Sequence, residues 1–389
     1  MINPCGIEGN IIRLLNFKII FYTLFLFAFV YGQSDFSFKN ISVKDGLAES
    51  TVKVIYEDHN GLMYLGTENG LDVYDGYEFN NYHMNSFDDN SILGNKVSSI
   101  SEDKKGNIWV GTELGVSVFD PRTRIFSRPI NSKELNGNIL EDPETIINDF
   151  YGNIWIKLSE TGKIYKYTDS TKSTSCMNCN NNSELDTLKI TVLFGDYTNT
   201  IWFGSEAGLF SYDAKLDKIN KYPLEIGMIN SIVNGQENEI WVGSNNGLVK
   251  VMNGPNGNYN FYKKSSSQSS IVSDNVKDLA WDANRNMLWI ATDNGLSRYN
   301  PSEDKFFNIQ TTPYADSIVE NDISELLVAT RSGRLWYTTE TEPGINCLSV
   351  EFDSESKTPP PANHFEHDPI DEKSIADNNI TDFIEDRAG

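Results

Sequence analysis

The sequence has few cysteines and no long apolar run. Only four cysteines occur among 389 residues, which excludes the densely cross-linked scaffolds of small secreted proteins. The longest apolar run, residues 19–31, has 13 residues and is shorter than the roughly 20 needed to cross a bilayer. It follows Arg13 and Lys18 and is typical of the core of a secretory signal peptide. We therefore expect residues 1–32 to be a cleaved signal peptide and the mature protein to be periplasmic.

Basic residues are scarce relative to acidic ones. The chain has 32 lysines and arginines against 55 aspartates and glutamates, a formal net charge of −23 at pH 7. Such a charge repels a phosphate backbone, so nucleic acid is excluded as a partner of this part of the protein. With 39% hydrophobic and 12% aromatic residues, the chain still has ample material for a large core, which excludes disorder of the whole chain.

Histidine is as rare as cysteine, and neither residue type forms a recognisable site. Cys176 and Cys179 in CMNC can close a small disulfide in an oxidising compartment, but no second such pair or nearby histidine completes a zinc site. The histidines fall in expected turns or outer strands without a catalytic pattern of partners. They are His59, His83, His364 and His367. We predict no catalytic residue, no cofactor and no metal, and the ligand-binding residues are unknown at this stage.

One pattern recurs about every 45 residues along the chain. Its clearest copy is GNIWVGTELGVSVFD at residues 106–120, and four other segments match it closely. Two degenerate copies, residues 152–167 and 333–348, complete the series. The central aromatic residue, here called the anchor, is Tyr64, Trp109, Trp155, Trp202, Trp241, Trp289 and Trp336 in the seven copies. This period, with alternating apolar residues, is typical of a four-stranded propeller blade.

We therefore predict an all-β fold, a seven-bladed β-propeller of four-stranded antiparallel blades. In the second copy, residues 97–103, 107–112, 115–120 and 124–130 are the expected strands. The glycine six residues after the anchor is expected to close a tight turn with positive φ, which is cheap only without a Cβ. These glycines are Gly70, Gly115, Gly208, Gly247 and Gly295.

Several polar residues recur in register with the anchors. An aspartate six positions before the anchor is interpreted as a turn residue that binds its own backbone, in preference to a ligand-binding role. These aspartates are Asp58, Asp103, Asp149 and Asp196. The anchors are interpreted as core between blades, with carbohydrate stacking as the less favoured alternative. Acids beside the turn glycine are candidates for a carboxylate ring on one face, although acids are common there for local reasons. They are Glu68, Glu113, Glu206 and Asp293.

The two ends of the chain suggest how the ring closes. Residues 38–58 repeat the order of features in 79–103, so one outer strand precedes the first blade. Pairing of this strand with the last blade would remove two exposed sheet edges. We expect a propeller over 34–352 closed by that N-terminal strand, then a Pro-rich linker over 353–363. Residues 364–389 are expected to be the truncated start of a second propeller or of an eighth blade.

The segment DGLAESTVKVIYEDHNGLMYLGTENGLDVYDG, residues 45–76, resembles the two-component regulator propeller repeats. The resemblance covers about 34–389. It implies the periplasmic propeller of a hybrid two-component sensor histidine kinase, of which this chain is a fragment without kinase and output domains. It also implies an oligosaccharide ligand, control of glycan-utilisation genes and a homodimeric full-length receptor.

Two alternatives to a sensor stay open at the level of sequence. Propellers also include glycan lyases and hydrolases, and fold alone does not decide function. In the Asp boxes of sialidases the glycine follows the aspartate by two positions, whereas in the DHNG and DKKG segments it follows by three, so that match fails. We predict that the chain is not an enzyme. The other alternative is a protein-interaction scaffold.

Overall fold

The structure is a computed structural model that describes residues 43–349 with gaps, residues 362–365 and residue 375. The gaps are 50, 76, 132–141, 150, 180–187, 199, 214–215, 217, 253–256, 268, 312–317, 319–320, 330–333 and 340–344. All described residues belong to the unit Asn40–Gly389. The predicted signal peptide, residues 1–32, therefore lies outside the described residues. In the described part, no helix has the length and apolar character required to span a membrane.

Seven four-stranded antiparallel sheets follow a short 3₁₀ helix, η1 (Val43–Asp45). In every sheet, strands that are neighbours in sequence are hydrogen-bonded neighbours. We number the sheets as blades 1 to 7 along the chain. The strands of blades 1 to 3 are β1 (Val52–Glu57), β2 (Met63–Thr67), β3 (Gly70–Tyr74), β4 (Phe79–Tyr82), β5 (Val97–Glu102), β6 (Ile108–Thr112), β7 (Gly115–Asp120), β8 (Ile125–Asn131), β9 (Pro143–Asn148), β10 (Asn153–Leu158), β11 (Ile164–Thr168) and β12 (Ser173–Cys176).

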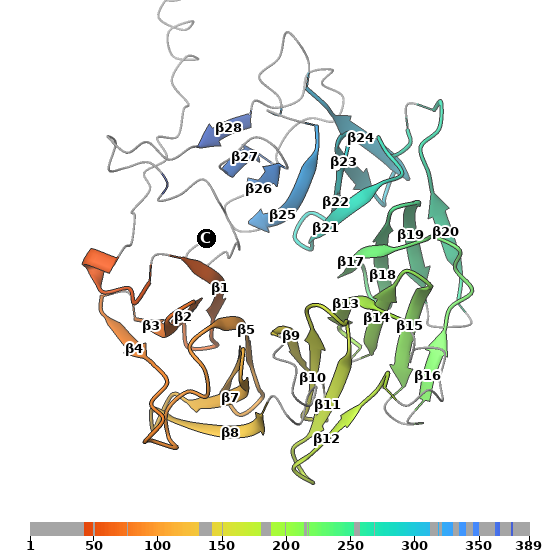
Figure 1. Cartoon of the computed structure of the whole chain (residues 1–389). Coiled ribbons are helices and arrows are strands. Elements are labelled where there is room, and N and C mark those ends of the chain that lie inside the picture. The colour runs from red at the N-terminus through yellow and green to blue at the C-terminus, as the bar shows by residue number, and fades with distance from the viewer. Residues whose placement is uncertain are drawn as a thin grey trace, which may run out of the picture. The chain divides into compact units, whose positions relative to one another are not determined.

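Blades 4 to 7 repeat this plan. Their strands are β13 (Ile190–Gly195), β14 (Ile201–Ser205), β15 (Gly208–Asp213), β16 (Lys218–Lys221), β17 (Ile229–Asn234), β18 (Glu239–Ser244), β19 (Gly247–Met252), β20 (Tyr259–Tyr262), β21 (Val276–Asp282), β22 (Met287–Thr292), β23 (Gly295–Asn300), β24 (Lys305–Ile309), β25 (Ile323–Ala329), β26 (Arg334–Thr339), β27 (Ile345–Ser349) and β28 (Ala362–Phe365). The first strand of each blade contacts the first strand of the next, from β1 through to β25. Figure 1 shows these first strands on the inner side and the fourth strands on the outer side. The predicted seven-bladed propeller is confirmed.

The outer position of blade 7 corrects one expectation. β28 pairs antiparallel with β27 and supplies the fourth strand of that blade. The sequence analysis divided these residues between the linker 353–363 and the tail 364–389. The backbone pairing of β28 with β27 assigns residues 362–365 to blade 7, because β27 would otherwise expose an unpaired edge. Closure of the ring by the N-terminal strand is not confirmed, since β28 holds the fourth position and residues 34–42 lie outside the described part.

The anchors form the core between blades, as the sequence analysis predicts. Six of the seven are buried, and each of those six lies in a hydrophobic cluster with residues of the following blade. Trp155 of blade 3, for example, is fully buried against Phe203 and Tyr212 of blade 4, with ring centroids 5.8 and 4.8 Å away. Indole rings of this size fill the wedge between two twisted sheets.

A glycine at the second position after the anchor lets neighbouring blades approach closely. A Cβ on Gly66 would lie 2.5 Å from Val97 of blade 2, and one on Gly243 would lie 2.6 Å from Val276 of blade 6. Real Cβ atoms do not tolerate such distances to branched side chains, so the glycine is required by packing. Blade 6 has the buried Ala291 at this position, and blade 3 has Lys157.

The recurring aspartate ties the turn between the first two strands to the anchor. Oδ1 of Asp149 accepts hydrogen bonds from the backbone N–H groups of Tyr151 and Asn153, at 2.9 and 2.8 Å. Its Oδ2 accepts the indole Nε1–H of Trp155 at 3.0 Å. Asp103 and Asp196 accept the same set of bonds, and Asp58 accepts the two backbone bonds and the hydroxyl of Tyr64 in place of an indole N–H. The predicted turn role is confirmed, and the sequence analysis missed the bond to the anchor.

Blade 5 shows what happens without this carboxylate. Gly235 stands at the aspartate position, and the buried Nε1 of Trp241 has no hydrogen-bond partner among the described residues. A buried donor without a partner costs free energy. Blade 5 therefore keeps its anchor through packing, with Trp241 fully buried against Tyr299 at a centroid distance of 5.2 Å.

We expect Gly243→Ala to lower the free energy of unfolding by about 1–3 kcal/mol, because the added methyl overpacks the junction of blades 5 and 6. Gly195→Ala is the matched control, since its Cβ would meet its nearest neighbours at 3.6 and 3.7 Å. That change should stay within about 0.5 kcal/mol. Urea denaturation of the two variants measures both effects, and equal stabilities would contradict the packing role of Gly243.

We expect Asp149→Ala to lower the free energy of unfolding by about 2–4 kcal/mol, because it leaves the buried Trp155 Nε1–H and two backbone donors without an acceptor. Asp75 is the control, since its Oδ1 accepts two backbone N–H groups in a surface turn but binds no indole. Asp75→Ala should have a much smaller effect. Thermal unfolding followed by near-ultraviolet circular dichroism compares them, and a small loss in Asp149→Ala argues against the bond to the anchor as a stabilising contact.

Candidate functional site

The turn between the second and third strands of a blade is held by a hydroxyl group. In five blades a buried Ser or Thr donates its side-chain hydrogen bond to the carbonyl of the turn glycine, at 2.7–3.2 Å. They are Thr67, Thr112, Ser205, Ser244 and Thr292. The five turn glycines have φ between +114° and +129°, as predicted. The Ser or Thr three residues after the anchor, preceded by glycine in four of these blades and by Ala291 in blade 6, was the signal for this hydroxyl. The sequence analysis did not use it.

Two of the four acids beside these turns, Glu113 and Asp293, hold local structure. Both carboxylate oxygens of Glu113 accept backbone N–H groups, from Asn95 at 3.2 Å and Lys96 at 2.9 Å. Asp293 accepts the side-chain amide of Asn275 at 3.1 Å. These bonds tie each turn to the loop that enters the same blade. The contacts support the local interpretation over a catalytic carboxylate ring.

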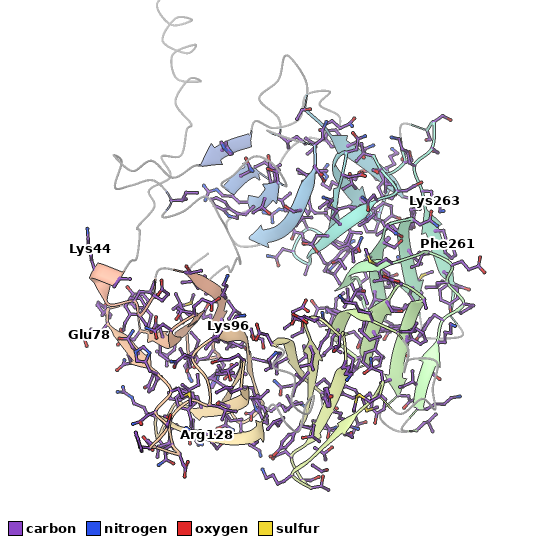
Figure 2. All side chains as sticks on the ribbon, viewed as in Figure 1. Lys44, Glu78, Lys96, Arg128, Phe261 and Lys263 are labelled. Carbon is purple, nitrogen blue, oxygen red and sulfur yellow. A yellow bond between two sulfur atoms is a disulfide. The ribbon has the colours of Figure 1, made fainter. Side chains whose placement is uncertain are left out.

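Ion pairs near the inner strands connect blades on the face that carries these turns. Lys96 of blade 2 pairs with Asp142, just before β9 of blade 3, at 2.6 Å, and Lys277 of blade 6 pairs with Asp322, just before β25 of blade 7, at 2.6 Å. Figure 2 labels Lys96 on the inner side of the ring. Its hydrogen bond to Asp142 raises the pKa of Lys96 against the effect of partial burial, and Glu68 and Glu113 add to the rise. Lys96 is therefore charged at neutral pH.

A carboxyl group of a half-buried residue joins three blades on the same side. Asp278 of β21 accepts a hydrogen bond from the hydroxyl of Ser231 in blade 5 at 2.9 Å and from the N–H of Leu326 in blade 7 at 3.0 Å. Burial raises the pKa of Asp278, and the hydrogen bonds only partly oppose that rise. A carboxyl group that links three inner strands couples their positions.

The histidines occupy turns and outer strands, and none of those described lies in a catalytic arrangement. His83 bonds the carbonyl of Asn69 at 2.6 Å, and His364 bonds the side chain of Asn346 at 2.7 Å. His367 lies outside the described residues. His59 pairs with Glu102 beside Asp58, and these three are a possible group of metal ligands within the described part. The Asp58 oxygens already accept bonds from its turn and from Tyr64, so we assign no metal there.

The cysteines resolve an alternative that the sequence left open. Cys176 and Cys179 form a disulfide with their Cα atoms 5.6 Å apart. Between them, the buried Asn178 accepts the N–H of Ile164 at 2.8 Å and donates to the carbonyl of Gly162 at 3.2 Å. The disulfide therefore closes a turn that fixes the end of β12 to β11. Cys347 is free and buried, and burial raises its pKa to about 12.

A pocket of about 340 Å³ lies between blades 2 and 3. It is formed by the turn before β6, the turn and strand around β8, and the turn after β11. These turns lie at the opposite ends of the strands from the Ser/Thr turns, because β6 starts at one turn and ends at the other. The sequence analysis did not identify this pocket, because its residues come from two blades.

Residues 91–113 match the family model described as the two component regulator propeller. This segment runs from the loop before β5 through β6 of blade 2. Blade 2 carries a two component regulator propeller repeat. The family resemblance inferred from residues 45–76 is thus confirmed at the neighbouring copy. The other blades share its aromatic anchor, and four of them share its turn glycine.

One curated relative is a histidine kinase, "Histidine kinase P4" of Formosa agariphila. It is 34% identical over 76 residues, which are 20% of this chain and 6% of the relative. The chain therefore matches only a small share of the relative's length.

One solved structure of those compared shares the propeller fold. A streptogramin B lyase superposes with a TM-score of 0.50 at 15% identity, over 76% of this chain and 92% of the lyase. The extracellular domain of BT3049 from B. thetaiotaomicron, described as a hybrid two component system, gives a TM-score of 0.39 at 19% identity, over 82% of this chain and 52% of that one. At these identities the likeness to the lyase shows the fold alone.

We expect Asp278→Asn to change how stability depends on pH. The pKa of Asp278 in the folded state lies above its ordinary value of 3.8. The protonated carboxyl therefore contributes its full stabilisation below pH 3.8. This contribution is lost as the pH rises through the pKa of the folded state. The asparagine variant should therefore gain stability relative to the unaltered protein as the pH rises. Urea denaturation from about pH 4 to about pH 8 tests this, with the exposed Asp89→Asn as control. Parallel curves for both variants would contradict the burial of a charge.

Proposed function

We propose that this chain is the extracytoplasmic ligand-sensing propeller of a hybrid two-component signalling receptor. The observation that carries the proposal is the two component regulator propeller repeat in blade 2. The 34% identity to a histidine kinase over 76 residues supports it. The kinase and output domains would belong to parts of the parent protein beyond this sequence, and the location would be periplasmic.

The proposed ligand is an oligosaccharide, and the proposed output is control of glycan-utilisation genes. A ligand drives such a receptor only through different affinities for two arrangements of its domains. The propeller contributes a rigid frame, because anchors, aspartate turns and inter-blade ion pairs hold its blades together. Loops at the strand ends would carry the specificity, and a homodimeric receptor would bring two such frames together.

An enzyme is the second candidate, and the propeller of a lyase motivates it. We favour sensing over catalysis. The Asp and Glu residues of the repeat whose contacts are described above accept hydrogen bonds in turns and at blade junctions. Glycan cleavage needs carboxylates that can act on the substrate instead. A protein-interaction scaffold stays an alternative for the same surfaces.

We expect the chain without residues 1–32 to bind a glycan-derived oligosaccharide with a Kd in roughly the micromolar range and to leave it uncut. Calorimetric titration against a panel of such oligosaccharides measures binding, and mass spectrometry of the same mixtures detects products. Heat-unfolded protein is the control for unspecific binding. Cleaved products would overturn the sensor in favour of the enzyme, and a panel without any binder would argue against oligosaccharide sensing.

A further inference from the structure

Blade 3 lacks the hydroxyl that holds the turn between the second and third strands of five other blades. The buried Leu158 stands at the position of the Ser or Thr. Residues 159–163 separate β10 from β11, whereas two residues separate the corresponding strands in blades 1, 2, 4, 5 and 6. Leucine has no hydroxyl to donate, so the backbone groups of this longer turn need other partners. The CMNC segment, residues 176–179 at the end of β12, supplies them.

The contacts of the CMNC segment with the turn are hydrogen bonds. The buried Asn178 accepts the N–H of Ile164 at 2.8 Å and donates to the carbonyl of Gly162 at 3.2 Å. The N–H of Met177 donates to the carbonyl of Ile164 at 2.8 Å. Both residues lie between the two cysteines of the disulfide. The disulfide restricts the conformations of this segment and so holds the groups that bind the turn in place.

The turn that is held in this way connects blade 3 to both of its neighbours. The carbonyl of Gly162 accepts the N–H of Ile190, the first residue of β13 in blade 4, at 3.4 Å. A Cβ on Gly162 would lie 2.5 Å from the backbone N and O of Ile190, so the two segments are in close contact. The N–H of Ser159 donates to the carbonyl of Asp142 at 3.1 Å, and the carboxylate of Asp142 pairs with Lys96 of blade 2. The turn therefore links three blades.

The CMNC segment also packs against the core on both sides of blade 3. Cys176 and Cys179 contact the hydrophobic cluster between blades 2 and 3, and Met177 contacts the cluster between blades 3 and 4. A disulfide that closes so short a loop restricts the unfolded chain less than one that closes a long loop. Its main effect is therefore on the local order of the turn and of these two junctions.

The disulfide is placed where a thiol can reach it. Cys176 and Cys179 are both half-buried, and β12 is the edge strand of its sheet. Cys347, in contrast, is buried in blade 7, and burial raises its pKa to about 12. Since the thiolate is the reactive form in disulfide exchange, Cys347 does not take part at neutral pH. Within the described part of the chain, exchange is therefore confined to the CMNC segment.

We propose that the Cys176–Cys179 disulfide is a redox switch that sets the order of the blade 3 turn and, through it, the coupling of blades 2, 3 and 4. A dithiol reductant supplies the two electrons. One of its thiolates attacks one sulfur, the S–S bond breaks, and the other cysteine leaves as a thiolate that takes up a proton. The second thiol of the reductant loses its proton and attacks the mixed disulfide. This step releases the remaining cysteine, which also becomes a thiol, and leaves the reductant as a disulfide.

The switch goes beyond the proposed sensing function and does not depend on it. Without the disulfide, the CMNC segment gains conformational freedom, and the hydrogen bonds that it makes to the turn open more often. The bonds from the turn to the neighbouring blades then lose their support. Reduction is therefore expected to loosen one side of the propeller locally and to leave the other blades intact.

Hydrogen–deuterium exchange tests the switch on the purified protein, with dithiothreitol as the dithiol. Alkylation and mass spectrometry count the free thiols without denaturant. We expect dithiothreitol to reduce the Cys176–Cys179 disulfide in the folded protein and to speed the exchange of the Ile164, Met177 and Ile190 amides at least tenfold. The amides of Gly70 and Gly295 are internal controls, because they donate to backbone carbonyls at the corresponding turns of blades 1 and 6. Their exchange should change less than twofold.

Two variants separate the disulfide from other effects of the reductant. The double variant Cys176→Ser/Cys179→Ser should show the fast exchange with and without dithiothreitol. Cys347→Ala is the matched control, since it removes a cysteine outside the disulfide and should keep the full response. Thermal unfolding checks that both variants are folded, and the unaltered protein before and after reduction is a sufficient test by itself.

Three results would overturn the proposal. The first is a disulfide that dithiothreitol reduces only after urea has unfolded the protein. The second is complete reduction with exchange of the three turn amides unchanged within twofold. The third is fast exchange that persists after the disulfide has formed again in air, because a switch must be reversible.

Discussion

The packing of one aromatic ring against the next sheet is the contact on which the propeller depends. A single four-stranded sheet with one apolar face is marginally stable in water, so each blade needs its neighbour. The anchors supply that contact from Tyr64 in blade 1 to Trp289 in blade 6. Because the ring is built from neighbour contacts, its stability is close to a sum over junctions. Any binding surface formed by the loops of the propeller therefore depends on these packed junctions.

Short-range hydrogen bonds fix the turns at the ends of the strands, with the aspartate turn in four blades and the hydroxyl turn in five. At one end the aspartate binds its own turn and the anchor indole, as Asp149 does with Trp155. At the other end a buried hydroxyl such as Thr112 binds the carbonyl of the turn glycine. The recurring turn aspartates and Ser or Thr hydroxyls described above are engaged in these hydrogen bonds. On the proposed sensing function, residues that differ between blades would supply the contacts to a ligand.

Departures from the repeat change the junctions in which they occur. In blade 3, Lys157 replaces the packing glycine and is buried, and its ammonium pairs with Glu144 at 2.5 Å. A charged side chain at a packed junction demands a partner, and Glu144 on the neighbouring strand provides it. In blade 5, Gly235 replaces the turn aspartate, and the Nε1–H of Trp241 has no acceptor among the described residues. The ring tolerates these exceptions because every junction has several contacts.

The sequence by itself determined the repeat, the seven blades, the strands of blade 2 to within one residue, and the turn roles of Asp58 and Gly70. These follow from local chemistry, since a period of two, a turn glycine and an Asp turn need only nearby residues. Tertiary structure decided the rest. β28 takes the outer place in blade 7 because an open edge needs pairing, and the pocket beside Trp109 exists only where blades 2 and 3 meet. Contacts between residues distant in sequence have no local signature, so neither was visible in the chain alone.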